Sequence, residues 1–402
     1  MTKPVLTADL GVPENWDRRG LPAWTYHSDA LLELEKDQVF RTHWQIVCHV
    51  SDIPEPGNFI TLDMVGERAL VVRDTKGRVS AFHNICRHRG SRVVAEERGT
   101  CRGALVCPFH GWVYNLDGTL RGPARPETFS NLDRAAFGLI PLDLEIWHGF
   151  VFVRFAPGPQ PSVAELMAPV ETEIAHYRMA EMAPADEAIY TDISPVNWKS
   201  VRDVDNEGYH VAMAHPALQD LYGHSYFDEP YVNGISRSCG TFLREGRRRW
   251  AVRHYAKFST PRPHLPEDMH QTWLYWGIWP NMVLAATPES MSFYQEFPLA
   301  TDKTQLRSAV YRFPDESRQE RAARYLAARI DRETYEEDVQ LTIWSNESMA
   351  SKAFAGFHLS DLEYGVRTHH DRLRELVPVT RLDAIPEGSD LASLNAEMLA
   401  EA

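Results

Sequence analysis

The chain has 402 residues, which is enough for two domains or for one large core with a smaller module attached. Hydrophobic residues make up 44% and charged residues 24%, an ordinary composition for a soluble globular protein. The formal net charge of -14 argues against nucleic acid or an anionic membrane as the main partner.

The N-terminus, MTKPVLTADLGVPENW, lacks the basic and then apolar region of a secretion signal. No apolar run approaches the roughly 20 residues that a membrane span needs, so the expected location is the cytoplasm. The five cysteines are too few and too scattered for a disulfide scaffold in a chain of this size. Cys86 and Cys107 are therefore expected to be ligands, and Cys48, Cys101 and Cys239 to be small buried hydrophobic side chains.

Three regions of different character follow one another along the chain. Residues 1–43 combine a polar lead with a helical pattern of apolar residues, which predicts an adapter that packs on the last domain. Residues 44–157 carry short apolar runs separated by turns at 74–77 and 115–118, which predicts a small all-β domain. The proline-rich stretch 156–162 is the predicted linker.

Residues 158–402 mix helical and strand patterns and predict a larger domain, with an antiparallel sheet flanked by helices. One helix is expected over 198–215, and aromatic strands over 272–286. Long helical patterns run from about 316 to 352. The expected fold class is α+β, with the small β domain followed by the mixed domain.

Two Cys-His pairs lie close together in NICRHRGSRVVAEERGTCRGALVCPFHGW: Cys86 with His88, and Cys107 with His110. Two thiolates and two imidazoles suit either zinc or an iron-sulfur cluster. Structural zinc sites usually pair like with like, whereas here each segment brings one Cys and one His. This mixed pairing favours a Rieske 2Fe-2S centre, in which one iron keeps two Cys and the other takes two His.

The segments CRHRG and CPFHGW resemble the Rieske domain of the large (alpha) subunit of Rieske non-haem iron oxygenases. Gly90, Pro108 and Gly111 agree with this resemblance because they allow two ligand loops to turn tightly. The 18 residues between His88 and Cys107 are slightly more than this family is expected to have. The resemblance assigns the cluster ligands as Cys86, His88, Cys107 and His110.

A second group of candidates lies in NWKSVRDVDNEGYHVAMAHP, residues 197–216. Glu207 and His210 are three apart and would share one face of the expected helix, whereas His215 would diverge from His210 by about 140°. Pro216 pushes the residue before it out of the helical region, so the helix is expected to end there and let His215 turn in. Two His with one carboxylate form the facial triad of non-haem Fe(II) oxygenases.

The resemblance extends to this second segment and gives its histidines a role. It implies that His210 and His215 bind a mononuclear Fe(II), with Asp338 of YEEDVQLTIW as the third ligand. Glu336 and Glu337 are rival carboxylates, and an acidic run is commonly just a solvated helix face. The chain departs from the commoner family pattern after Asp338, where SNESMAS stands in place of a Gln-Gly pair.

The resemblance gives Glu207 the role of a bridge instead of a ligand. Glu207 would hydrogen-bond His210 in its own subunit and the Rieske histidine His110 of a neighbouring copy. A carboxylate beside a metal-bound imidazole fixes its tautomer, which suits this role. Asp203 and Asp205 are rival carboxylates that lack the three-residue spacing to His210.

Partners follow from what the chain lacks and from the resemblance. No Gly-x-Gly-x-x-Gly fingerprint and no ferredoxin-type cysteine run is present in the sequence. Electrons would therefore come from an external NAD(P)H-dependent flavin and iron-sulfur reductase or from a ferredoxin. A homotrimer would bring the cluster of one subunit onto Glu207 of the next, and O2 would hydroxylate a small-molecule substrate.

The NWK-to-EGYH spacing and the tail LSDLEYGV resemble the branch that acts on quaternary amines such as choline, carnitine and betaines. The implied reaction is oxidative N-demethylation or monooxygenation, with hydroxylation of an aromatic acid or amine as the alternative. The aromatic pool for a cation cage is Trp273, Tyr275, Trp276 and Trp279, although aromatic strands also serve as plain core. Two other classes stay open: an electron-transfer module without catalytic iron, and a zinc-stapled binding protein.

Overall fold

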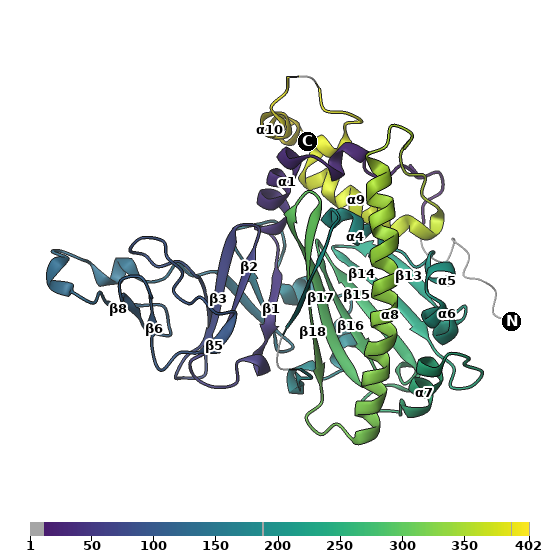
Figure 1. The fold of residues 1–402 in the computed structure, drawn as a ribbon, viewed down its shortest axis with the longest axis horizontal. Helices are drawn as coiled ribbons and strands as arrows, with labels where there is room; N and C mark the ends of the chain where they lie inside the picture. Colours follow the sequence, from purple (N-terminus) through teal and green to yellow (C-terminus); the bar gives the residue numbers. More distant parts are fainter. Residues whose placement is uncertain (1–11, 187–188, 387, 402) are drawn as a thin grey trace. The chain divides into compact units, whose positions relative to one another are not determined.

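The structure is a computed structural model that describes residues 12–186, 189–386 and 388–401. Part of the predicted adapter, residues 1–11, lies outside the described residues. The chain divides into two compact units (Figure 1); the smaller is Phe40–Glu165 with Met179–Ala183, and the larger holds the rest. Strands build the smaller unit, and an antiparallel sheet with helices builds the larger one, so the predicted α+β fold is confirmed.

The smaller unit consists of three antiparallel sheets, with strand orders β1-β10-β9, β4-β3-β2-β5 and β6-β7-β8. Both predicted hairpin turns are present, because the Gly77 amide bonds to the Asp74 carbonyl (3.1 Å) and the Gly118 amide to the Asn115 carbonyl (2.9 Å). The strands are β1 Gln45–His49, β2 Asn58–Met64, β3 Glu67–Arg73, β4 Val79–His83, β5 Arg98–Thr100, β6 Leu105–Val106, β7 Val113–Tyr114, β8 Leu120–Gly122, β9 Asp143–Trp147 and β10 Phe150–Arg154.

The larger unit is organised around an antiparallel sheet of order β18-β17-β16-β15-β14-β13, with β12 beside β18. The aromatic strands predicted over 272–286 are β15 and β16, which pair as a hairpin. The strands from 183 on are β11 Ala183–Pro184, β12 Tyr190–Ser194, β13 Phe227–Val232, β14 Ile235–Thr241, β15 Thr272–Ile278, β16 Met282–Thr287, β17 Ser290–Ala300 and β18 Lys303–Arg312.

Helix α8 is the longest helix among the described residues, with 32 residues, and it runs along this sheet (Figure 1). Its start is fixed by a capping box, in which Ser317 and Glu320 bond each other's backbone amides. None of the described helices is long and apolar enough to cross a membrane. The helices are α1 Asp29–Glu35, α2 Val163–Met167, α3 Glu171–Ala175, α4 Trp198–Asp205, α5 Val211–Ala214, α6 Pro216–Tyr222, α7 Trp250–Phe258, α8 Arg318–Met349, α9 Tyr364–Leu376 and α10 Leu391–Ala400.

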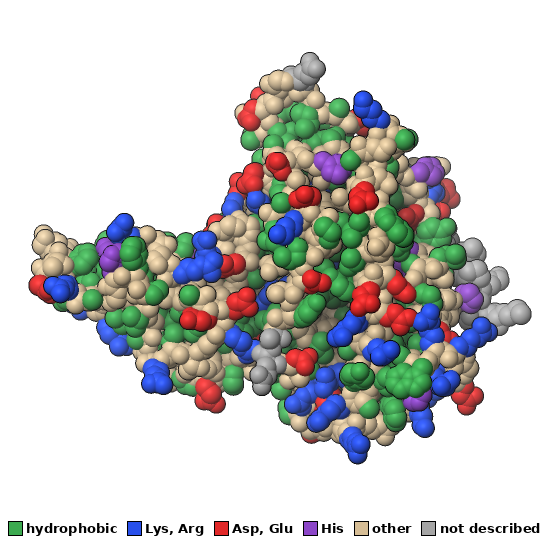
Figure 2. All heavy atoms as spheres, viewed as in Figure 1, with side chains coloured by type: hydrophobic (Ala, Val, Ile, Leu, Met, Phe, Trp, Pro, Cys, Tyr) green, Lys and Arg blue, Asp and Glu red, His purple; other side chains and the backbone are tan. Residues whose placement is uncertain are grey.

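Charged side chains of both signs are interspersed over the face seen in Figure 2.

The prediction of a single helix over 198–215 is wrong, because α4 ends at Asp205 and α5 begins only at Val211. The break is held from β13, where the Asp228 carboxylate accepts a hydrogen bond from the Gly208 amide (2.6 Å). Residue 208 must be glycine here, since a Cβ would lie 2.0 Å from the Tyr226 ring. Contacts with a later segment therefore override the helical pattern.

Two side chains of the NWK motif bind the buried carboxylate of Glu35, and the third caps a helix. Asn197 caps α4, while Trp198 Nε1 and Lys199 Nζ both donate to Glu35, at 2.8 and 2.6 Å. The Lys199 and Glu35 side chains are 1% and 0% exposed. Burial lowers the pKa of Lys199, and the adjacent Glu35 opposes that shift.

Replacing Lys199 by methionine is expected to destabilise the larger unit strongly. The change leaves the buried Glu35 carboxylate without its counter-charge, which typically costs about 3–5 kcal/mol. Thermal unfolding followed by circular dichroism measures the loss, and Lys36→Met, which removes a lysine whose partner Glu33 is exposed, is the control. A melting temperature equal to that of the control variant would contradict this account.

Candidate functional site

The two Cys-His segments form loops of identical hydrogen-bond pattern. In each loop the Cys amide bonds to the carbonyl five residues on, and the Cys carbonyl accepts from the glycine amide four residues on. Gly90 (φ 74°) and Gly111 (φ 66°) occupy the left-handed region that favours glycine, as the sequence predicted. The pairs are Cys86–Ser91 (2.7 Å), Cys86–Gly90 (3.0 Å), Cys107–Trp112 (2.8 Å) and Cys107–Gly111 (3.0 Å).

The structure brings the four predicted cluster residues together, sulfur with sulfur and nitrogen with nitrogen. Cys86 and Cys107 are buried in the same hydrophobic cluster, where burial raises the pKa of the Cys86 thiol. The His88 and His110 rings pack edge to face, with their centroids 4.7 Å apart. Nδ1 of His88 is buried without a hydrogen-bond partner among the described residues. This grouping fits a 2Fe-2S cluster, in which one iron takes two thiolates and the other two imidazoles.

Tyr114 adds a hydrogen bond to this site. Its hydroxyl accepts from the Arg87 amide (2.9 Å) and lies 3.3 Å from the Cys86 sulfur, so its own proton is directed at the sulfur. Burial raises the pKa of Tyr114, and the adjacent Cys86 raises it further, so the hydroxyl keeps this proton. Tyr114 is therefore positioned to stabilise a thiolate at Cys86.

The Tyr114→Phe variant is expected to have a cluster reduction potential lower by about 60 mV. A hydrogen bond to a sulfur ligand is worth about 1.4 kcal/mol in favour of the reduced state, which is 59 mV for one electron. A potentiometric titration followed by EPR measures the shift, with Tyr190→Phe, an exposed tyrosine, as the control. An unchanged potential would show that the hydroxyl does not act on the cluster.

The remaining cysteines stand apart from this pair. None of the five cysteines forms a disulfide, and Cys48 and Cys239 are buried as predicted, whereas Cys101 is only half-buried.

The second group of candidates meets where three helices converge. His210 precedes α5, His215 joins α5 to α6, and Asp338 lies on α8. The backbone of His215 has φ -117° and ψ 79°, and Pro216 is the first residue of α6, so the predicted helix end before the proline is confirmed. The Nε2 atoms of His210 and His215 are 3.0 Å apart. Oδ1 of Asp338 is 3.5 Å from the first and 2.9 Å from the second.

Two further carboxylates hold the other ring nitrogens. Nδ1 of His210 lies 2.5 Å from Glu207 Oε1, and Nδ1 of His215 lies 2.9 Å from Glu337 Oε2. Because a carboxylate accepts the Nδ1 proton in each case, the Nε2 lone pairs of the neutral rings face each other and Asp338. Oδ1 of Asp338 is buried and makes no hydrogen bond of acceptable geometry to any described residue.

Three converging lone pairs make a site for a cation. Burial opposes protonation of both imidazoles, but Glu207 at His210 and Asp338 at His215 outweigh it and raise the pKa of each ring. Among the described residues, His210, His215 and Asp338 form a group of potential metal ligands whose ligand atoms all lie within 4.8 Å of one another. Two imidazoles with one carboxylate suit Fe(II) with open coordination positions.

The rival carboxylates lie elsewhere or have another task. Asp203 accepts from the Tyr26 hydroxyl and pairs with His370, and Asp205 pairs with Arg202. Glu336 is exposed.

Sequence reasoning treated Glu337 only as a rival of Asp338 and missed its contact with His215. The sequence feature that could have indicated this contact is that Glu337 directly precedes Asp338, the predicted iron ligand.

Two family models match the chain. The "Rieske [2Fe-2S] domain" model matches residues 43–133, and the "Ring hydroxylating alpha subunit (catalytic domain)" model matches residues 177–378, half of the chain. Among solved structures, a quaternary ammonium Rieske monooxygenase matches with a TM-score of 0.74 at 21% identity, covering 92% of this chain and 98% of that one. Naphthalene 1,2-dioxygenase from Rhodococcus matches with a TM-score of 0.72 at 17% identity, covering 89% and 94%.

Curated relatives include the glycine betaine monooxygenase oxygenase subunit of Pseudomonas aeruginosa, 37% identical over 199 residues, or 49% of this chain and 45% of that protein. The carnitine monooxygenase oxygenase subunit of Escherichia coli is 27% identical over 314 residues, or 74% and 78%. The chain thus spans about half the length of the betaine-oxidising relative it matches. Carrying a Rieske 2Fe-2S domain and a catalytic domain of the type that binds mononuclear iron, the chain belongs to the family of ring-hydroxylating alpha subunits of Rieske oxygenases.

Proposed function

We propose that the chain is a terminal oxygenase component that hydroxylates a quaternary ammonium compound with O2 and with electrons from an external reductase. The observation that carries this proposal is the convergence of His210, His215 and Asp338 with their Nε2 and Oδ1 atoms facing one point. When bound there, Fe(II) activates O2, and the Rieske cluster supplies electrons one at a time. The family membership supports both cofactors.

Each residue of the two sites has one task in this proposal. Cys86, His88, Cys107 and His110 hold the cluster. His210, His215 and Asp338 hold the iron on one side and leave its other side free for O2 and substrate. Glu207 and Glu337 keep the Nδ1 protons in place, so that both rings present Nε2 lone pairs to the metal.

Electron transfer is proposed to cross a subunit boundary. Glu207, bonded to His210, would also accept a hydrogen bond from His110 of a neighbouring subunit in a head-to-tail homotrimer. His110 is exposed, which leaves its ring available to another subunit. Electron transfer between subunits is reported for the similar quaternary ammonium Rieske monooxygenase, and this supports the arrangement by analogy.

The electron donor is proposed to be an NAD(P)H-dependent flavin and iron-sulfur reductase or a ferredoxin, because the chain has no nucleotide fingerprint. The proposed location is the cytoplasm. The five cysteines form no disulfide, which suits the reducing conditions there.

The reaction is proposed to begin at an N-methyl carbon of the substrate. Hydroxylation consumes O2, two electrons and two protons, and gives water and an N-hydroxymethyl group, which releases formaldehyde and leaves the demethylated amine. Relatives named for glycine betaine, carnitine and choline oxidation support this substrate class.

Formaldehyde release by the iron-loaded protein with a surrogate reductase tests the function. Glycine betaine, carnitine and choline are screened against aromatic acids and amines, and at least one methylated ammonium compound is expected to give formaldehyde in proportion to O2 consumed. Ring or side-chain hydroxylation of an aromatic compound without formaldehyde would replace the proposal with the aromatic alternative.

A further inference from the structure

Among the interspersed charges of Figure 2, Lys and Arg side chains gather over α7 and the first half of α8. The segment RRRWAVRHYAK, residues 247–257, leads into α7 and forms most of it, with five Lys or Arg and no Asp or Glu. This excess is notable in a chain with a net charge of -14. The basic patch is defined here as the exposed residues Arg248, Trp250, Arg253, Lys257, Arg318, Arg321, Tyr325, Arg329 and Arg332.

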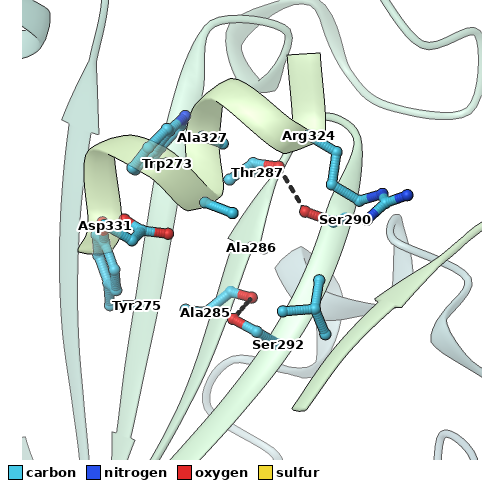
Figure 3. Close-up of a pocket in the computed structure, with 12 residues that line it drawn as sticks. Trp273, Tyr275, Ala285, Ala286, Thr287, Ser290, Ser292, Arg324, Ala327 and Asp331 are labelled. Carbon is cyan, nitrogen blue, oxygen red and sulfur yellow. Dashed lines mark hydrogen bonds between the residues drawn. The ribbon is translucent and has the colours of Figure 1, made fainter. Parts of the chain in front are cut away.

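The α8 part of the basic patch is one stripe of the helix. Its members recur at intervals of three and four residues, which places them on one face. The buried side chains of this half of α8, such as Leu326 and Ile330, lie on another side. Figure 3 shows that Arg324 and Ala327 turn toward a small pocket against the sheet. The stripe therefore faces away from both the core and the sheet.

The exposed face of α7 adjoins this stripe. Trp250, Arg253 and Lys257 also recur at intervals of three and four residues. The two helices share one hydrophobic cluster on their buried sides. On the outer side, the guanidinium carbon of Arg329 lies 5.9 Å from the centroid of the Trp250 ring. The exposed faces of α7 and α8 thus form one surface within the larger unit.

Most charges of the basic patch are not neutralised by neighbouring side chains. Arg321 pairs with Glu316, and two exposed acidic residues, Glu245 and Asp331, belong to the same segments of the chain. The other basic members form no ion pair with any residue that the structure describes: Arg248, Arg253, Lys257, Arg318, Arg329 and Arg332. Positive charge is therefore in excess and open to a partner.

Two exposed aromatic side chains give the basic patch the composition of a protein interface. Trp250 is 56% exposed and Tyr325 is 63% exposed. Trp, Tyr and Arg are the residue types that contribute most to binding between proteins. The acidic remainder of the chain would repel a long polyanion such as nucleic acid beyond the patch. These features favour an acidic protein of limited size.

The basic patch lies close to the iron ligands along α8. Arg332 precedes Asp338 by six residues and Arg329 precedes it by nine, which is about 9 and 14 Å along the helix axis. A typical interface covers about 800 Å² on each partner, which is roughly 30 Å across. A protein bound to the patch would therefore border the iron site, where the proposed function places the Rieske cluster of a neighbouring subunit.

We propose that the basic patch is the docking surface for the electron donor, an acidic protein of the 2Fe-2S ferredoxin type. One electron passes from the reduced 2Fe-2S centre of the donor to the oxidised Rieske cluster of the neighbouring subunit, and no covalent bond forms or breaks. Opposite charges accelerate the encounter, and Trp250 and Tyr325 then contact the donor. The inference rests on the proposed function and deepens it, because it assigns a surface to the external donor.

Reduction of the Rieske cluster, followed by stopped-flow absorbance without O2, tests this inference. The iron-loaded protein is mixed with a reduced plant-type 2Fe-2S ferredoxin, which is an acidic protein. Reduced methyl viologen, a small molecule that needs no docking surface, is the second donor. Rate constants are measured at 0.01 M and 1 M salt, where charge interactions extend over about 30 Å and about 3 Å.

Two variants with the same change of net charge are compared with wild type. The patch variant carries Arg253→Glu, Lys257→Glu and Arg329→Glu. The control variant changes three exposed residues outside the basic patch that likewise form no ion pair within the described part of the chain: Lys303→Glu, Lys352→Glu and Arg381→Glu.

The ferredoxin is expected to reduce wild type about 10-fold or more faster at 0.01 M than at 1 M salt, because screening removes the attraction. At 0.01 M salt the patch variant should be slower than wild type by about 10-fold or more and should lose most of this salt dependence. The control variant should stay within about 2-fold of wild type. Methyl viologen should reduce the patch and control variants at equal rates, since their net charges are equal.

The outcomes separate this inference from the function on which it rests. If the ferredoxin reduces the patch variant as fast as the control variant, or wild type at one rate in both salt concentrations, the inference is overturned and the proposed function stands. Light scattering that shows a smaller assembly for the patch variant alone would also overturn it, and would assign the basic patch to contact with a second copy of this chain. A wild-type cluster that neither donor reduces would remove the proposed function itself.

Discussion

Asp338→Ala is expected to lose the mononuclear iron and keep the Rieske cluster. The variant leaves the Nε2 atoms of His210 and His215 facing each other at 3.0 Å, but it removes the only charged ligand of the three. Iron affinity should fall by more than about 100-fold, because even a partner outside the ligand set is worth 10- to 100-fold. Substrate hydroxylation should fall with it.

Iron content and EPR measure the two centres separately. Wild type is expected to hold about three irons per chain, and Asp338→Ala about two, with an unchanged signal of the reduced cluster. Glu336→Ala on the exposed side of the same helix is the control and should keep all three irons. Full iron content in Asp338→Ala would mean that Glu337, next to it and 2.9 Å from His215, has taken over as the ligand.

The cluster loops were predictable from the sequence because their determinants are local. The spacing of Cys86 and His88, repeated in Cys107 and His110, and the glycines that close each loop all lie within a few residues of one another. The same holds for the bend at His215, which a neighbouring proline imposes.

The parts that sequence reasoning missed depend on contacts between distant segments. The helix break at Gly208 is held by Asp228, 20 residues later, and the partner of the His215 ring is Glu337, 122 residues later. Neither pairing leaves a pattern in the spacing of nearby residues.

Replacing Glu207 by glutamine is expected to slow electron transfer between the two metal centres even when saturating Fe(II) keeps the mononuclear site loaded. Glu207 bonds His210 twice, through Nδ1 at 2.5 Å and through the backbone amide at 3.1 Å. Glutamine keeps the size of the side chain, but it removes the charge that holds the Nδ1 proton and that would accept the His110 proton of a neighbouring subunit. Turnover is expected to fall by about 100-fold, the upper range for a group that positions a metal ligand.

A measurement on the reduced protein separates this role from a merely structural one. The cluster is reduced without O2, and its reoxidation is followed by absorbance after O2 and substrate are mixed in, at saturating Fe(II). Reoxidation should be rapid in wild type and in the matched control Glu336→Gln, and slowed in Glu207→Gln in proportion to turnover. If Glu207→Gln loses iron and reoxidises its cluster at the wild-type rate once iron is restored, Glu207 only orients His210, and electrons pass between subunits by another route.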